Sequence, residues 1–361
     1  MFPRKLDRYI MTKFILTFCV ALILIIGIVI IFDISEKIDN FVEKQAPLHA
    51  IIFDYYLNFV PYFINMFSPL FVFITVIFFT SKMAANSEIV AILSCGISYH
   101  RMIVPYIVSA GLIAIMSLYL NLYIIPRANA ERVVFEEQYL KKRADSSGRN
   151  IHYQLNPGEY VYVESFSRWN NTAYKFTLEN IKDNNIVSKL SAESAVWDTT
   201  KSCWSLRKYT MREYYDGFDD VVKTGKQLDT ALSITVDDFR RGKKYIETLD
   251  YDQLKQFIDT QLMRGDADVK FSLIEKHKRF ALPFSAFILT IMGVALSSKK
   301  HRGGIGLNIG AGIALAFIYI LFLRFSEMFV YTDTLPPEIA LWLPNIIYFF
   351  IAAFLYRAAP K

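Results

Sequence analysis

The segment YVYVESF, Tyr160–Phe166, alternates apolar and polar side chains and follows the turn Asn156-Pro157-Gly158. Alternation with a period of two is typical of a β-strand with one buried face. We expect Trp197 and Trp204, further along, to lie in the core of such a sheet rather than to contact a ligand. The same pattern recurs in KFTLENI (Lys175–Ile181), IVSKLSAESAVWD (Ile186–Asp198) and SCWSLRKYTMREY (Ser202–Tyr214). Short strands separated by turns predict a β-sandwich or a jelly-roll-like sheet.

Hydrophobic spans flank this β region, three before it and three after it. A transmembrane helix needs about 20 apolar residues, and 53% of the 361 residues are hydrophobic, which is high for a soluble domain. The sequence therefore predicts a membrane α-helical bundle of six transmembrane helices with an inserted all-β domain. The charge-free windows are Phe14–Phe32, Tyr55–Ser81, Met102–Pro126, Phe280–Ser298, Gly303–Leu323 and Ile339–Tyr356.

The predicted organisation has three parts. Residues 1–129 hold the first three spans, an N-terminal interfacial helix and a short helix at 87–96. Residues 130–274 form the β domain, which ends in a helix with apolar side chains at helical spacing. Residues 275–361 hold the last three spans. The apolar positions of the helix after the sheet are Leu254, Phe257, Ile258 and Leu262.

The distribution of basic residues predicts the orientation in the membrane. Short cytoplasmic segments are enriched in Lys and Arg. If the N-terminus is cytoplasmic, the short outer loops hold only Lys37 and Lys44. We therefore expect both termini to be cytoplasmic and the β domain to be outside. The inner segments then hold Arg4, Lys5, Arg8, Lys13, Lys82, Arg101, Lys299, Lys300, Arg302, Arg357 and Lys361.

The first span resembles a signal peptide because basic residues precede it. It is longer than a usual signal core, and FDISEKIDNF follows it instead of a small-residue cleavage site. We expect the span to be retained. Arg4, Lys5 and Arg8 alternate with apolar residues in a way that predicts a short amphipathic helix on the membrane surface before the span.

The loop SKMAANSEIVAILSCGIS, Ser81–Ser98, predicts a short amphipathic helix at the cytoplasmic surface. Ser87 suits the N-cap, Glu88 suits the first turn, and Gly96 suits a helix stop with positive φ. The apolar side is formed by Ile89, Val90, Ile92 and Leu93. Such a helix rests on lipid or docks in a groove of a cytoplasmic partner. The carboxylate favours docking, since it repels anionic lipid and suits a groove that bears Arg.

Several kinds of chemistry have no motif here. There is no G-x-x-x-x-G-K-[ST], H-E-x-x-H or G-x-S-x-G, and Cys19, Cys95 and Cys203 have no metal-ligand spacing with the histidines. The spans are nearly free of ionisable residues, which argues against a proton-coupled carrier. The net charge of +6 forms no basic stripe with interleaved aromatics, so we expect no nucleic-acid partner. We expect no metal and no cofactor on this chain.

Arg324 is the exception among the spans. It lies near the outer end of the fifth span, in LFLRFSEMF, with Glu327 three residues later. Arg324 either reaches the interface and pairs with Glu327 or contacts anionic lipid head groups. The outer cations Lys37, Lys44 and Arg127 carry the same alternatives.

Five segments along the chain resemble one known family. The chain resembles the LptF/LptG (YjgP/YjgQ) permeases of lipopolysaccharide export over essentially its whole length, and it is more similar to the G-type than to the F-type. The segments are LDRYI (Leu6–Ile10), SEIVAILSCGIS (Ser87–Ser98), NLYIIPRAN (Asn121–Asn129), EKHKRFALP (Glu275–Pro283) and LWLPN (Leu341–Asn345).

The resemblance implies a specific assembly. Such permeases have six transmembrane helices and a periplasmic β-jelly-roll, and they pair as an F–G heterodimer in the inner membrane of Gram-negative bacteria. The pair binds two copies of a cytoplasmic ABC ATPase, which hold ATP and Mg²⁺. Lipopolysaccharide leaves the outer leaflet of that membrane and passes to periplasmic jelly-roll bridge proteins toward the outer membrane.

The resemblance also implies roles for particular residues. The helix at 87–96 corresponds to the coupling helix, which makes Glu88, Ser87, Ile89, Leu93 and Gly96 the candidates for coupling to the ATPase. Spans one and five line the lateral opening for the lipid. The candidates for contact with the lipid A phosphates are Arg324, Lys37, Lys44 and Arg127. The chain departs from the family pattern at the outer end of span one, where Asp33 and Glu36 accompany Lys37.

Three hypotheses follow for the function. The first is a permease subunit that extracts lipopolysaccharide, driven by a separate ATPase. The second is a membrane scaffold whose β domain recruits envelope partners, which predicts neither an ATPase nor a bound lipid. The third is an intramembrane enzyme that acts on lipid, which predicts paired catalytic polar groups within the spans; the sequence has none.

Overall fold

The structure is a computed structural model of the chain, and it divides into two compact units. The helical unit comprises residues 1–140, 247–252 and 273–361, and the β unit comprises residues 141–246 and 253–272. Of the basic residues expected on the inner side, Arg4, Lys299, Lys300, Arg302 and Lys361 lie outside the described residues. The structure describes residues 5–140, 148–167, 170–199, 201, 203–215, 219–232, 234, 236, 243–266, 268–298 and 304–359.

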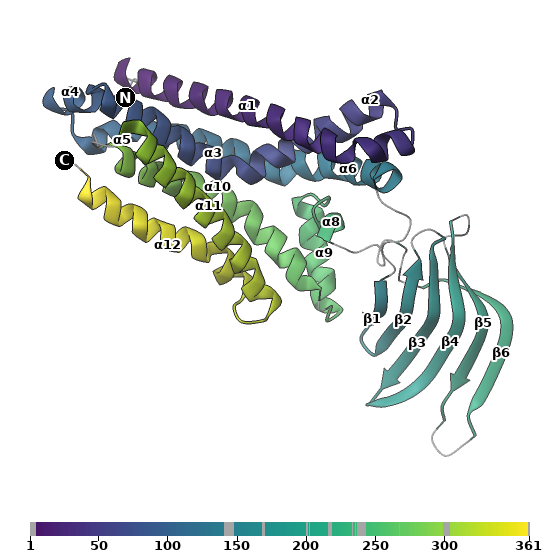
Figure 1. Ribbon diagram of the computed structural model, residues 1–361. Coiled ribbons are helices and arrows are strands. Elements are labelled where there is room, and N and C mark those ends of the chain that lie inside the picture. Colours follow the sequence, from purple (N-terminus) through teal and green to yellow (C-terminus); the bar gives the residue numbers. More distant parts are fainter. Residues whose placement is uncertain are drawn as a thin grey trace. The chain divides into compact units, whose positions relative to one another are not determined.

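Six helices in the described residues are long and apolar enough to cross a membrane, which confirms the predicted bundle. Three precede the sheet in sequence and three follow it (Figure 1). The first three spans are built from α1 (Lys5–Glu43), α2 (Leu48–Ala50) with η1 (Ile51–Tyr56) and α3 (Leu57–Ala85), and α5 (Tyr99–Tyr119) with η2 (Leu120–Ile124) and α6 (Ile125–Tyr139). The last three are α10 (Val269–Ser297), α11 (Gly304–Tyr331) and α12 (Pro337–Ala358).

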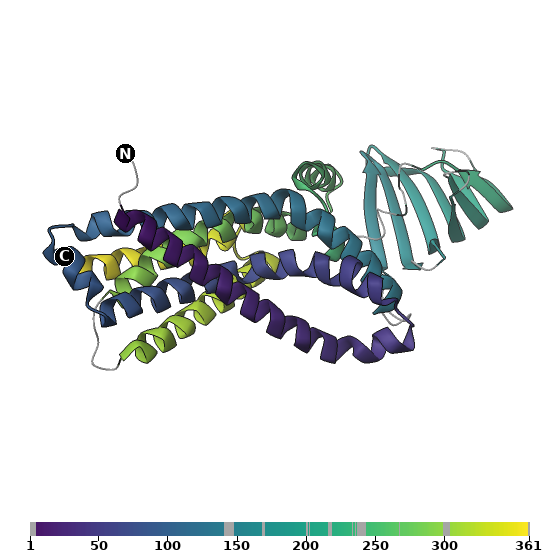
Figure 2. The same ribbon diagram turned by 90° about the horizontal axis from the view of Figure 1, so that it is seen from above.

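The start of α1, the end of α12 and the short helix α4 (Glu88–Ser94) lie at the same end of the bundle, called here the α4 end (Figures 1 and 2). The N-terminal amphipathic helix predicted from Leu6 and its neighbours is not a separate element. It forms the first turns of α1, which continues into the span without a break. The apolar run after Lys13 keeps helical spacing through the junction, so nothing in the sequence ends the helix there.

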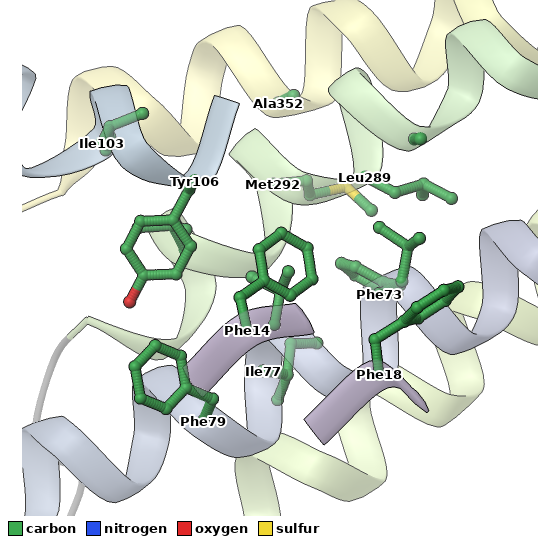
Figure 3. Close-up of a cluster of buried hydrophobic side chains, with 14 of the residues drawn as sticks. Phe14, Phe18, Phe73, Ile77, Phe79, Ile103, Tyr106, Leu289, Met292 and Ala352 are labelled. Atoms are coloured by element: carbon green, nitrogen blue, oxygen red, sulfur yellow. The ribbon is translucent and has the colours of Figure 1, made fainter. Parts of the chain in front are cut away.

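The core of the helical unit contains side chains from α1, α3, α5, α10 and α12 (Figure 3). Phe14 and Phe18 of α1 are at most 2% exposed and pack with Phe73 and Ile77 of α3. The helices α3 and α11 approach closely at Gly312, where an added Cβ would overlap with Cδ1 of Ile77. Small residues allow such an approach in membrane bundles, where packing rather than water drives association.

The packing of α1 changes along its length. Its buried residues near the α4 end are Asp7, Ile10, Phe14, Phe18 and Leu22, and the next buried residue is Phe41. Seen from above, α1 runs obliquely across the other helices, and its second half diverges from them (Figure 2). The half of α1 beyond Leu22 therefore presents apolar side chains that the described chain does not cover.

The β unit contains a six-stranded antiparallel sheet whose strands pair in sequence order (Figure 1). Each strand predicted from alternation is present, and β1 and β6 add an edge on either side. A jelly roll packs two sheets, whereas the described strands form one curved sheet. The strands are β1 (Gly148–Asn156), β2 (Glu159–Ser167), β3 (Thr172–Lys182), β4 (Asn185–Asp198), β5 (Cys203–Glu213) and β6 (Val221–Thr230).

One face of this sheet is buried in a cluster that includes Ile234 and Val236, which follow β6. Trp204 is fully buried, and its Nε1 donates a hydrogen bond of 2.7 Å to the carbonyl oxygen of Ile234. The ring of Trp197 packs edge-on at 5.2 Å, so the prediction that both tryptophans belong to the core is confirmed. Two helices follow, α8 (Lys243–Ile246) and α9 (Tyr251–Met263). Of the apolar positions predicted for α9, Leu254 and Ile258 are buried, whereas Leu262 is 57% exposed at the end of the helix.

Candidate functional site

The helix α4 begins differently from the sequence prediction. Ser87 occupies the N-cap position but adopts a left-handed conformation with φ 61°, and its side chain makes no capping hydrogen bond. The tight turn from α3 requires this backbone geometry, in which the hydroxyl does not reach the amides of the first turn. Gly96 has φ 82°, as expected for the residue that ends the helix.

The apolar face of α4 is turned into the bundle. Ile89 is 1% exposed within the core, and Leu93 packs against the same core. Val90, by contrast, is 60% exposed. Ile89 and Leu93 therefore anchor α4, while Val90 and the exposed Gly96 remain on its accessible side.

The carboxylate of Glu88 links α4 to two other segments. The hydroxyl of Tyr9 in α1 donates a hydrogen bond of 3.0 Å to Glu88 Oε2, and Asn86 Nδ2 donates one of 3.3 Å to Oε1. Two residues before Tyr9, the carboxylate of Asp7 accepts two hydrogen bonds from Arg101 at the start of α5. The start of α1 thus contacts both the helix at 88–94 and the helix that follows it.

Lys37, near the opposite end of α1, lies in an aromatic and acidic cluster. Its ammonium group donates hydrogen bonds to Asp33 Oδ1 and to the hydroxyl of Tyr55. Tyr56 donates a hydrogen bond of 3.0 Å to the other oxygen of Asp33. The ammonium group also lies 4.9 Å from the ring centroid of Tyr55 and 5.9 Å from that of Phe59. The charge of Lys37 is therefore balanced within the chain, by the carboxylate that departs from the family pattern.

Arg324 lies at the rim of a cavity of about 260 Å³ formed by α3, α10, α11 and α12. Its Nη1 is 3.4 Å from Glu327 Oε2, and its side chain is 52% exposed. Glu327 Oε1 is also 3.6 Å from Lys278 Nζ, so one carboxylate serves two cations. The pairing of Arg324 with Glu327 is present, and the exposed guanidinium keeps donors free for an anion. The cavity is lined by Met66, Phe67, Pro69, Lys278, Ala281, Leu282, Ile320, Leu323, Arg324, Glu327 and Leu341.

The other two predicted cations lie elsewhere in the helical unit. Arg127 is exposed on α6, and Lys44 is half-buried in the turn after α1. Neither lines the cavity beside Arg324. The four predicted lipid contacts are thus distributed over several elements rather than gathered in one cluster of this single chain.

The sequence analysis missed a group of buried polar residues near Lys278. Asn65 Nδ2 donates a hydrogen bond of 2.6 Å to Asn121 Oδ1, and Ser117 donates one of 2.6 Å to Asn65 Oδ1. Arg279, 2% exposed, donates to Glu275 at 3.0 Å. The sequence does indicate the ion pair, because Glu275 and Arg279 are four residues apart and therefore lie on the same face of a helix. Asn65, Asn121, Glu275 and Arg279 line a second pocket together with Lys278.

Comparison with known proteins identifies the family. A search of curated proteins found no match. The sequence model of the family described as lipopolysaccharide export system permease LptF/LptG matches residues 8–358, which include both helical halves and the β region between them. The chain therefore belongs to the LptF/LptG family of lipopolysaccharide export permeases.

Proposed function

We propose that this chain is one permease subunit of an ABC transporter that extracts lipopolysaccharide from the inner membrane and passes it to periplasmic jelly-roll bridge proteins. The observation that carries the proposal is the family match over residues 8–358, since it includes the membrane spans and the inserted sheet together. The chain supplies the lipid path. A cytoplasmic ATPase, present in two copies, binds ATP with Mg²⁺ and hydrolyses it. A paralogous F-type permease completes the heterodimer.

The proposed orientation has both termini and α4 in the cytoplasm and the β unit in the periplasm. Two features support it. The basic residues of the short loops favour this side for the termini. The bundle also carries α4 at the same end as the start of α1 and the end of α12 (Figure 1). In this orientation α4 is the contact for the ATPase, with Ile89 and Leu93 holding it on the bundle and Val90 facing the partner.

The lipid path in this proposal runs from the membrane, past cations on α1 and α11, to the β unit. Arg324 is more accessible to a lipid phosphate than Lys37, because its side chain is 52% exposed and that of Lys37 is 23% exposed. Lys37 binds a phosphate only after it leaves Asp33. Arg127 and Lys44 are further candidates along this path.

The proposal is tested by isolating the full-length protein from native membranes and identifying bound proteins and lipid by mass spectrometry. We expect an ABC ATPase, a second permease of the same family and lipopolysaccharide. In the purified complex, Glu88→Ala should uncouple ATP hydrolysis from lipid transport with folding retained. The matched control is Glu43→Ala, which removes an exposed carboxylate at the end of α1 that lies away from α4. Recovery of periplasmic partners with neither ATPase nor lipid would support the scaffold function instead.

A further inference from the structure

Two contacts join the first turns of α1 to the segment that contains α4 and α5. Nη1 and Nη2 of Arg101 lie 2.8 and 2.6 Å from Oδ1 and Oδ2 of Asp7, 94 residues away in sequence. The hydroxyl of Tyr9 lies 3.0 Å from Glu88 Oε2. Asp7 and Arg101 therefore form a bidentate ion pair. Tyr9, two residues after Asp7, forms a second contact with Glu88.

The geometry of the Asp7–Arg101 pair fixes orientation as well as distance. A guanidinium that donates two parallel hydrogen bonds to one carboxylate cannot rotate without breaking one of them. The side chains of Asp7 and Arg101 are 10% and 26% exposed, so water replaces these bonds only in part. Movement at the start of α5 is therefore transmitted to α1 rather than absorbed by side-chain rotation.

The helix α1 is suited to carry such movement over a long distance. It runs for 39 residues without a proline, which corresponds to about 58 Å at a rise of 1.5 Å per residue. Only its half near the α4 end packs in the core, through Ile10, Phe14, Phe18 and Leu22. The far half has no buried residue between Leu22 and Phe41. It is held there by Phe41, which packs with Tyr55, and by the hydrogen bond of Lys37 to the same tyrosine. Because the helix is long and unbroken, a rotation at Asp7 is carried along it to the contacts that hold Lys37.

We propose that Asp7, Arg101 and Tyr9 form a clamp through which displacement of α4 moves α1, so that the ATPase controls the position of Lys37 at the other end of the helix. The inference rests on the proposed function, and it adds the residues through which movement passes from α4 to α1. Glu88 then has an internal role, because one of its oxygens contacts α1 and the other contacts Asn86 in the turn from α3. Asp7, Arg101 and Tyr9 are positioning residues in this mechanism.

The test uses the full transporter complex, purified with its partner proteins and reconstituted in liposomes that contain lipopolysaccharide. Lipid moved per ATP hydrolysed is measured together with complex assembly and thermal stability. We expect Asp7→Asn and Arg101→Lys to keep ATP hydrolysis and to lower lipid moved per ATP about tenfold, the effect of losing a charge-assisted hydrogen bond. Tyr9→Phe should act in the same direction.

The exchanged pair, Asp7→Arg with Arg101→Asp, restores opposite charges at the same place. We expect it to recover most of the lipid moved per ATP, which a merely structural loss at either position would not allow. Arg8→Ala is the matched control, since it removes an exposed charge from the same turn of α1 without touching the clamp. Spin labels on α4 and near residue 37 give a second measurement, the distance change on ATP binding at both ends.

The outcomes separate the clamp from the proposed function. If the wild-type complex contains no ATPase or moves no lipid, the proposed function fails. If the wild type transports and Asp7→Asn transports equally well per ATP, the clamp is wrong and the function stands. If the single variants do not assemble, the exchanged pair and the spin-label distances decide: movement of α4 without movement near residue 37 contradicts the clamp.

Discussion

The ammonium group of Lys37 lies 4.9 Å from the ring centroid of Tyr55 and donates a hydrogen bond to the hydroxyl of the same residue. Asp33, one helical turn earlier, accepts a further hydrogen bond from this ammonium group. An anionic head group that binds Lys37 must therefore compete with an internal carboxylate. Any anion that approaches Lys37 therefore meets an ammonium group already paired with a carboxylate of the same helix.

The variant Asp33→Asn should strengthen crosslinking of a phosphorylated lipid to the region of Lys37. The substitution removes the competing negative charge and keeps the shape of the side chain. Lipid crosslinking through a photoreactive residue near position 37 measures the effect. Asp39→Asn, which removes another carboxylate from α1 outside this cluster, is the control. Equal crosslinking in the Asp33→Asn variant and the wild type would show that Asp33 does not regulate Lys37.

Charge reversal in Arg324→Glu should weaken binding of a phosphorylated lipid and leave assembly with the partner chains intact. A cation near an anionic lipid surface contributes about 1 kcal/mol, so reversal lowers affinity about thirtyfold. Arg324→Lys keeps the charge and should lose much less. Lipid crosslinking and copurification measure the two effects, and unchanged crosslinking would remove Arg324 from the lipid path.

The close approach of α3 and α11 predicts that Gly312→Ala destabilises the helical unit. The new Cβ overlaps with Cδ1 of Ile77, which is fully buried, and overpacking of this kind costs about 1–3 kcal/mol. Adding Ile77→Val removes that atom and should recover part of the loss. Gly310→Ala, in the same helix with no atom within 4 Å, should be tolerated. Thermal unfolding in detergent, followed by circular dichroism, distinguishes these variants.

In the β unit, Trp204→Phe leaves the carbonyl oxygen of Ile234 without its 2.7 Å hydrogen bond. An unsatisfied buried acceptor costs about 1–3 kcal/mol. We expect faster proteolysis within residues 148–232 of the full-length protein, measured by the masses of the fragments. Trp197→Phe, at a half-buried position of the facing strand, should change the rate less. An equal effect of both substitutions would mean that ring volume, rather than the hydrogen bond, matters.

The ion pair of Lys201 and Asp229 gives a prediction for acid stability. Lys201 Nζ donates to Asp229 Oδ2 at 3.0 Å, and this hydrogen bond, followed by those from Gln227 and Ser205, lowers the pKa of Asp229 from 3.8 to about 2. A lowered folded-state pKa stabilises the fold above pH 3.8, and this contribution disappears as the pH falls through 2. Lys201→Met should return the pKa of Asp229 toward 3.8, as measured by carboxyl-carbon NMR. A pKa that stays near 2 in the variant would assign the shift to Gln227 and Ser205.

Hydrophobic length and alternation were sufficient to predict the six spans and the four strands β2 to β5, because both patterns depend on residues close in sequence, whereas the edge strands β1 and β6 were not predicted. The packing of the spans was not predictable in the same way. Ile89 and Val90 are equally apolar, yet Ile89 is buried and Val90 is exposed. Which of them faces the bundle depends on the left-handed turn at Ser87, and a serine gives no sign of that conformation.

The sequence indicated which charged residues belong to the candidate site, but it indicated only some of the residues that they contact. Arg324 and Glu327 are three residues apart on one helix, so their pairing was foreseeable. The contacts of Lys278 with Glu327 and of Asp7 with Arg101 join segments far apart in sequence. A single sequence contains no pattern that specifies such partners, because they result from how the helices pack.

The separation of Asp7 and Arg101 also bears on how the protein is made. Arg101 is synthesised 94 residues after Asp7. At a synthesis rate of about 5–20 residues per second, this separation corresponds to a delay of roughly 5–20 s. During that interval the first helix carries a carboxylate whose guanidinium has not yet been synthesised. The contact that joins the start of α1 to α5 can therefore form only after the first two spans have been synthesised.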